Sequence, residues 1–144
     1  IFKLSSSSIV TVKKEIDGFI LNRLQGALLN EAMRLYSEGY ASSDDIDATI
    51  KDGLGLRWAF MGPFETIDLN APGGIKDYMA RYGSIFIEMA KTQTKIPDWS
   101  ENAGKKLELE RRKILSENDL EKRAKKRNFL LKQLRRLKIE NDET

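Results

Sequence analysis

Few side chains in this sequence are suited to catalysis or metal binding, because its 144 residues include no cysteine and no histidine. Thiolate chemistry and disulfides are therefore excluded within the chain, and so are the commonest general base and the commonest metal ligand. Carboxylates are plentiful, but Asp44, Asp45 and Asp47 lack the glycine and the terminal glutamate that a calcium loop needs at fixed spacing. We expect no metal site and no complete catalytic centre in the chain.

Two polar residues remain as candidates for a site. Asn22 is an amide in the first turns of an otherwise apolar helix, so it must either hydrogen-bond inside the protein or face a site. Arg57 lies in a predicted loop beside Trp58 and Phe60, where a guanidinium can hold a carboxylate through two hydrogen bonds. By residue chemistry alone, a structural amide at position 22 and a surface arginine stacked on Trp58 remain open alternatives.

Asn22 belongs to the segment around which the chain is organised, Gly18 to Gly39. Apolar residues recur there at steps of three and four and cover most of the circumference, which predicts a long helix buried on several sides. Asp17 is the expected N-cap, and Gly39 is expected to end the helix in a left-handed conformation. Gly26, inside the helix, suggests close approach of another backbone.

The remaining segments predict an all-α domain of roughly five to seven helices. Glycines at 53 and 55 are expected to form a loop, and Pro63 to start the helix that follows it. Only residues 9–12 have a weak β pattern, so residues 1–14 are interpreted as an N-terminal lead-in and 15–144 as the domain. The expected helices cover residues 44–51, 63–70 and 75–92, with two basic helices between 105 and 138 that separate near 116–119.

The last third of the chain is strongly basic. Between Lys105 and Lys138 there are fourteen lysines and arginines and five acids. A basic surface of this kind suits an anionic partner, but it is also typical of a helix docked on the domain with its charged side in water. The second interpretation is favoured by a predicted apolar stripe, formed by Leu120, Ala124, Leu130, Leu131, Leu134 and Leu137.

The overall composition is that of a soluble domain, with 33% charged and 40% apolar residues. No apolar run approaches the roughly 20 residues that cross a membrane. The sequence start lacks the pattern of a signal peptide. A cytoplasmic protein is therefore expected.

Several ordered motifs resemble one family. Residues 17–24 (DGFILNRL), 43–47 (SDDID), 53–60 (GLGLRWAF) and 61–65 (MGPFE) follow one another at compatible spacing. Together they resemble the C-terminal domain of the 3-hydroxyacyl-CoA dehydrogenase superfamily. The 53–60 block is most similar to the lambda-crystallin branch, whose enzyme is L-gulonate 3-dehydrogenase.

The resemblance implies a fold and a division of labour. The expected fold is that of the 6-phosphogluconate dehydrogenase C-terminal domain, and the helical domains are expected to form a homodimer. The family's NAD-binding domain supplies a histidine–glutamate pair, which Asn22 would assist at the domain cleft. Arg57, by resemblance to the lambda-crystallin branch, would bind a small 3-hydroxy acid. This chain has no GxGxxG motif after a strand, so we expect no NAD binding and no activity from it alone.

Two other functions remain open at this point. The basic helices could form a binding module for nucleic acid or an acidic protein, although no nucleic-acid motif accompanies them. A structural role of the crystallin type would need only solubility and a stable dimer.

Overall fold

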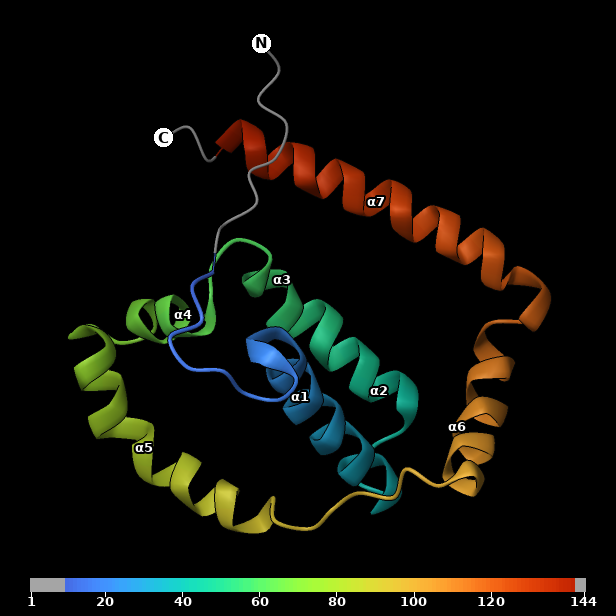
Figure 1. Cartoon of the computed structure of the whole chain (residues 1–144), viewed down its shortest axis with the longest axis horizontal. Coiled ribbons are helices and arrows are strands. Elements are labelled where there is room, and N and C mark those ends of the chain that lie inside the picture. Colours follow the sequence, from blue (N-terminus) through green and yellow to red (C-terminus); the bar gives the residue numbers. More distant parts are fainter. Residues whose placement is uncertain (1–9, 142–144) are drawn as a thin grey trace. The chain divides into compact units, whose positions relative to one another are not determined.

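The computed structural model describes residues 10–141, and within that range every regular element is a helix (Figure 1). The predicted all-α fold is confirmed, and Val10–Val12 does not form a strand. Residues 1–9 and 142–144 lie outside the described residues. Residues 1–8 of the predicted N-terminal lead-in are among them. The elements are α1 (Phe19–Ser37), α2 (Ser43–Ala48), η1 (Thr49–Leu54, a π-helix), α3 (Gly55–Trp58), α4 (Pro63–Leu69), α5 (Gly74–Thr92), α6 (Glu101–Ile114), η2 (Glu117–Asp119, a 3-10 turn) and α7 (Leu120–Asn141).

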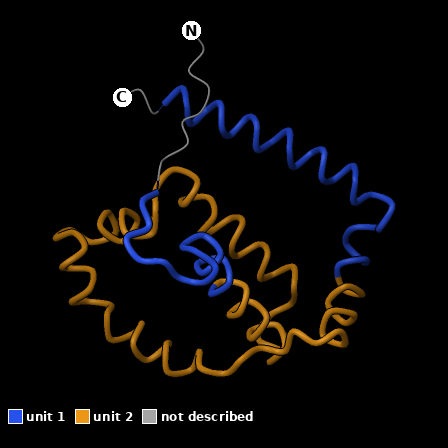
Figure 2. The backbone as a smooth tube through the Cα atoms, in the orientation of Figure 1, with its two compact units in different colours: residues 1–27, 111–144 blue, residues 28–110 orange. Residues whose placement is uncertain are grey.

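The chain divides into two compact units, coloured separately in Figure 2. Unit 1 comprises residues 1–27 and 111–144, and unit 2 comprises residues 28–110. The first half of α1 therefore belongs to unit 1 and its second half to unit 2. Each unit is described by itself below.

Glycine conformations mark both ends of α1. Gly18 has φ +81° and Phe19, the first residue of α1, has φ +49°, so the helix starts from a left-handed turn and one residue later than a cap at Asp17 would require. At the other end, Gly39 has φ +79°, as predicted. The Tyr40 amide donates to the carbonyl of Leu35 at 2.9 Å and the Gly39 amide to that of Tyr36 at 3.1 Å, the paired bonds of a Schellman motif.

The second half of α1 supplies most of the core. Met33 and Tyr36 are two of the three apolar side chains that are buried among the described residues, the third being Ala71. The first half is different, since Leu21 is 75% exposed and Leu24 is 61% exposed. Burial on several sides was therefore a correct prediction for only part of this helix. An apolar circumference permits burial, but neighbouring elements have to provide it.

Residues 43–58 form one continuous helical path. Ser42 is the N-cap, with its Oγ accepting a hydrogen bond from the Asp45 amide at 3.2 Å. The predicted loop at glycines 53 and 55 is wrong, because η1 carries the helix through both into α3. The Gly55 amide donates to the Ile50 carbonyl, five residues back, and a Cβ at position 55 would lie 2.9 Å from that oxygen. The wider π turn therefore needs a glycine here.

Helices α4 and α5 follow the expected boundaries. Pro63 occupies the first turn of α4, and buried Thr66 donates from its hydroxyl to the Gly62 carbonyl at 2.8 Å. The turn between the helices is held by Asp68, whose Oδ1 accepts from the Ile75 amide at 2.6 Å. The short α4 and the long α5 are thereby joined through a backbone-to-carboxylate bond.

Helices α6 and α7 are separated at residues 117–119, where the sequence predicted a break. The leucine stripe on α7 is not buried, since Leu120, Leu130, Leu131 and Leu137 are between 42% and 56% exposed. The described part of unit 1 therefore contains no element that buries this stripe, and the docked arrangement expected from the sequence is not found within it. None of the described helices has the length and apolar character needed to cross a membrane.

Candidate functional site

Asn22 lies early in α1, immediately after the left-handed turn at Gly18. A Cβ at Gly18 would lie 3.7 Å from the Asn22 Cβ, so this turn folds closely against the residue. The Asn22 side chain is exposed, and within residues 10–141 it makes no hydrogen bond. Among the described residues, Asn22 is therefore not a hydrogen-bonded structural amide, which was the alternative that residue chemistry alone left open. The amide is available to a group from outside this part of the chain.

Arg57 lies in the last turn of α3, in unit 2. The predicted loop around it is wrong, because η1 and α3 make the segment helical. The Arg57 carbonyl accepts from the amides of Phe60 at 3.1 Å and Met61 at 3.2 Å, which closes the helix end. The guanidinium is exposed, and no described aromatic ring is stacked against it. The stacking on Trp58 that residue chemistry left open is therefore absent from the described structure.

Exposed apolar side chains surround position 57 in the sequence. Leu56 is 64% exposed, Trp58 41% and Phe60 54%, and Phe64 follows on α4 at 75%. A cation next to so much uncovered aromatic and aliphatic surface is suited to an apolar partner or ligand that also carries a negative charge. The helix fixes the arginine backbone more firmly than the expected loop would.

The two predicted site residues fall in different units, Asn22 in unit 1 and Arg57 in unit 2. The structure therefore describes their surroundings separately and does not join them in one site.

A polar cluster that the sequence did not reveal joins α1, α2 and α6 within unit 2. The Tyr36 hydroxyl donates to Glu110 Oε1 at 3.0 Å, and the Lys106 ammonium lies 5.7 Å from the Tyr36 ring centre. Burial and the neighbouring Glu110 carboxylate raise the pKa of the Tyr36 phenol. Hydrogen bonds from Tyr36 and then Ser43 lower the pKa of Glu110. Tyr36 and Glu110 are 74 residues apart, so no local pattern could have paired them.

A second cluster on α1 contains an ionic network. Arg34 donates to both oxygens of Glu31, at 2.6 and 2.9 Å, and to Glu38 at 2.9 Å. These contacts lower the pKa of Glu31, with the hydrogen bond from Arg34 as the largest cause. Nearby, Trp99 Nε1 donates to Asn30 Oδ1 at 3.0 Å and ties the segment before α6 to α1. The carboxylates of both clusters already accept hydrogen bonds from side chains of unit 2, so the clusters are structural features of that unit rather than open sites.

The chemistry available to the described residues is limited. Within residues 10–141, no group of three histidine, cysteine, aspartate or glutamate side chains is arranged to hold a metal ion. Asn22 offers a hydrogen-bonding amide and Arg57 offers a cation. These are functions of orientation and binding, and not of proton transfer.

Comparison with known proteins identifies the fold. Residues 18–127 match the family model of the 3-hydroxyacyl-CoA dehydrogenase, C-terminal domain. The chain belongs to this family. The matched range contains both Asn22 and Arg57, and it begins at the glycine turn that precedes α1.

Named relatives divide into two groups. The lambda-crystallin homolog of Rattus norvegicus is 50% identical over 91 residues, which is 63% of this chain and 28% of that protein. The lambda-crystallin homolog of Mus musculus is 46% identical over 100 residues, or 69% of this chain and 31% of that protein. The L-carnitine dehydrogenase of Oceanobacillus iheyensis is 32% identical over 125 residues, 85% of this chain and 40% of that protein. The chain thus spans about a third of the length of these relatives.

Proposed function

We propose that this 3-hydroxyacyl-CoA dehydrogenase C-terminal domain supplies substrate contacts to an NAD-dependent dehydrogenase of small, free 3-hydroxy acids, with L-gulonate as the first candidate. The observation that carries the proposal is the family match over residues 18–127, which includes an exposed Asn22 with no hydrogen bond among the described residues. The relatives named L-carnitine dehydrogenase support the substrate class, because carnitine is itself a free 3-hydroxy carboxylic acid. A cytoplasmic location, where such soluble acids are available, is part of the proposal.

Arg57 is the proposed carboxylate-binding residue. Its guanidinium is exposed, has no described aromatic ring stacked against it, and is held on the last turn of a helix. A guanidinium offers two parallel N–H groups that match the two oxygens of a carboxylate. A substrate that kept its carboxylate free would therefore gain more from Arg57 than a thioester would.

Asn22 is the proposed assistant to the catalytic base. Proton transfer from a hydroxyl group requires a general base, and the chain has no histidine to serve as one. The histidine, its glutamate partner and NAD would be contributed by a nucleotide-binding domain outside this chain. The Asn22 amide would then orient the substrate oxygen or the histidine at the cleft between the two domains.

The experiment is steady-state kinetics of a full-length dehydrogenase that contains this domain. For Arg57→Ala, KM for the free hydroxy acid should rise about 10- to 100-fold, since a charge-assisted hydrogen bond to the substrate is lost. Arg57→Lys should retain part of the affinity, because it keeps the charge and loses the paired geometry. Lys51→Ala is the matched control, a 72% exposed cation on the preceding turns. An unchanged KM in Arg57→Ala would refute its binding role.

For Asn22→Ala we expect kcat to fall about 10- to 100-fold while KM changes little, since the amide would act mainly in the transition state. Gln25→Ala, which removes another exposed amide three residues further along α1, is the control and should leave kcat unchanged. Equal effects of the two substitutions would assign Asn22 to general helix stability instead.

The proposal includes a homodimer formed through the helical domain. Support comes from the large apolar side chains that each unit leaves uncovered, such as Leu21 in unit 1 and Phe64 in unit 2, both 75% exposed. Large exposed apolar patches on a folded protein are typical of interfaces.

A further inference from the structure

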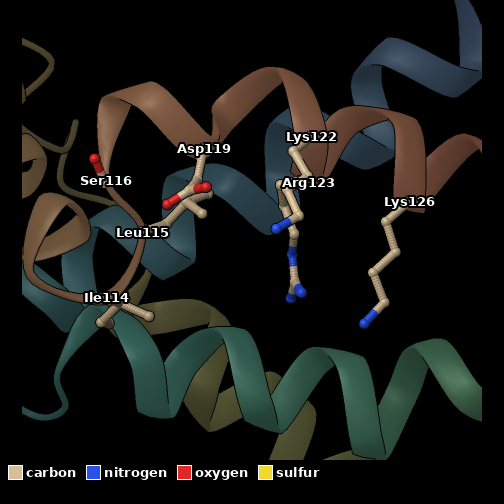
Figure 3. Close-up of a pocket in the computed structure, with 7 residues that line it drawn as sticks. All are labelled: Ile114, Leu115, Ser116, Asp119, Lys122, Arg123 and Lys126. Atoms are coloured by element: carbon tan, nitrogen blue, oxygen red, sulfur yellow. The ribbon is translucent and has the colours of Figure 1, made fainter.

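A pocket of about 370 Å³ lies at the corner between α6 and α7, entirely within unit 1 (Figure 3). Its volume is in the range of pockets that hold small organic ligands. One end contains apolar side chains and the other contains three cations. The lining residues are Ile114, Leu115, Ser116, Asp119, Lys122, Arg123 and Lys126.

The three cations are placed for a shared anion. Lys126 lies three positions after Arg123 and four after its neighbour Lys122 on α7, and Figure 3 shows all three side chains leaving the helix on the same side. None of the three has an ion-pair partner within the described part of the chain. Lys125, between them, is different because it pairs with Glu121 at 2.6 Å. Three like charges this close repel one another, and an anion bound among them would relieve that repulsion.

The charge and composition of the pocket narrow the class of ligand. Asp119 is the only acid lining it, so the lining carries a net charge of +2, three cations less one carboxylate. A monocarboxylate would use one cation and leave the others unpaired. Ile114 and Leu115 line the other end, which suits an uncharged organic part of the same ligand.

We propose that this pocket binds a small organic molecule that ends in a diphosphate group. The terminal phosphates would contact Lys122, Arg123 and Lys126, and the organic part would lie toward Ile114 and Leu115. This site shares no residue with the substrate contacts proposed for Asn22 and Arg57. The proposal is for binding only, without a reaction of the ligand.

The probe is ADP, titrated into the purified 144-residue chain by isothermal calorimetry at physiological salt. Saturable binding with one site per chain is expected. NAD should bind far more weakly, because its diphosphate is esterified at both ends and its nicotinamide adds a positive charge, so its net charge is −1 and not −3. Asp119→Asn should tighten ADP binding by removing the only carboxylate from the pocket lining.

The decisive comparison uses two charge-matched double variants of α7. Lys122→Gln/Lys126→Gln removes two pocket cations four positions apart and should weaken ADP binding at least about tenfold. Lys132→Gln/Arg136→Gln removes two cations with the same spacing outside the pocket and should change it less than about twofold. All four side chains are exposed, so both variants should keep the helical circular dichroism of the parent chain.

Two outcomes would overturn the inference. If the wild-type chain shows no saturable ADP binding, the pocket is not a diphosphate site. If both double variants lose affinity equally, the attraction is a diffuse property of the basic helix, of the kind that would also bind nucleic acid without selectivity.

Discussion

At the scale of single residues, Tyr36 links α1 to α6 within unit 2. It is 8% exposed, its hydroxyl donates to Glu110, and Lys106 lies over its ring. This one side chain therefore combines apolar burial, a hydrogen bond and a cation–π contact between α1 and α6. Asn22 and Arg57, by contrast, are exposed and make no side-chain hydrogen bond or ion pair among the described residues, so their polar groups are available to bind another molecule.

The first prediction concerns the Tyr36 hydroxyl. Tyr36→Phe keeps the ring and removes the hydrogen bond, so Glu110 loses one of its hydrogen-bond partners and Tm should fall by about 2–4 °C. Tyr40→Phe is the matched control, because Tyr40 is 70% exposed and contributes its ring rather than its hydroxyl to Arg34. Differential scanning calorimetry of both variants is the measurement. Equal values of Tm would mean that the bond to Glu110 adds nothing to stability.

The second prediction concerns pH. Glu31 and Glu110 have lowered pKa values when folded, so their contributions are present above the unfolded value of about 4.3 and are lost as pH falls through the folded values. Tyr36 has a raised pKa, so its contribution is complete below about 10 and is lost as pH rises through the folded value. Urea midpoints should therefore decline at both extremes. Tyr36→Phe should reduce the alkaline decline, and an unchanged alkaline profile would contradict this assignment.

At the scale of elements, the path α2–η1–α3 decides where Arg57 is placed. Two glycines that predict a loop instead lie within a π-helical turn and the helix after it. The π turn adds a residue to the helical repeat, so every side chain after it is rotated relative to a plain α-helix. The direction of Arg57 thus depends on the close approach of Gly55 to the Ile50 carbonyl.

The third prediction compares these two glycines. Gly55→Ala would bring a Cβ to 2.9 Å from the Ile50 oxygen, so it should destabilise the fold by about 1–3 kcal/mol as the π turn shifts. Gly53→Ala meets open space and should be neutral or stabilising by up to about 1 kcal/mol, through its better helix propensity. Urea denaturation gives both values. A Gly55→Ala variant as stable as Gly53→Ala would show that the π turn is not required.

At the scale of the whole molecule, the described residues contain few buried apolar side chains and many exposed ones. Met33, Tyr36 and Ala71 are buried, while large apolar residues on α1, α5 and α7 keep 37% to 75% of their surface in water. Such surface is often covered by a second copy of the same chain, and the two-fold dimer is the commonest symmetric assembly of identical chains. Helix α1 offers one place for close contact, because a Cβ at Gly26 would meet nothing within 4 Å.

The fourth prediction is therefore self-association through α1. Sedimentation of the chain across a concentration series should show a dimer, and Gly26→Leu should shift the equilibrium toward monomer by more than tenfold. Gly104→Leu on α6 is the control, since position 104 is also helical and open. A monomer at every concentration would remove the dimer proposal. A dimer equally tolerant of both leucines would remove only the role of Gly26.

The fifth prediction is that the chain alone does not use NAD. Its sequence has no strand followed by a GxGxxG turn and a helix N-terminus, which is the arrangement that binds the diphosphate of a dinucleotide. Calorimetry should give no saturable binding at micromolar concentrations, and no hydride transfer should be detected. Micromolar NAD affinity would contradict the proposed division of labour between domains.

Local sequence signals determined the family and most helix boundaries. The motif blocks between residues 17 and 65 predicted a family that the match over 18–127 confirms. Gly39 ends one helix and Pro63 starts another as predicted, because helix ends and backbone conformation depend on a few neighbouring residues. Asn22 and Arg57 were selected from the same blocks, and their roles stay predictions.

The tertiary structure decided what local signals could not. Tyr36 meets Glu110 only because the chain returns after 74 residues, and the first half of α1 stays exposed because no described neighbour covers it. The same holds for the α7 stripe. Its leucines recur at helical spacing, but Leu120, Leu130, Leu131 and Leu137 are exposed. Periodicity reports which side chains would gain from leaving water, whereas burial depends on which surfaces the fold brings against them.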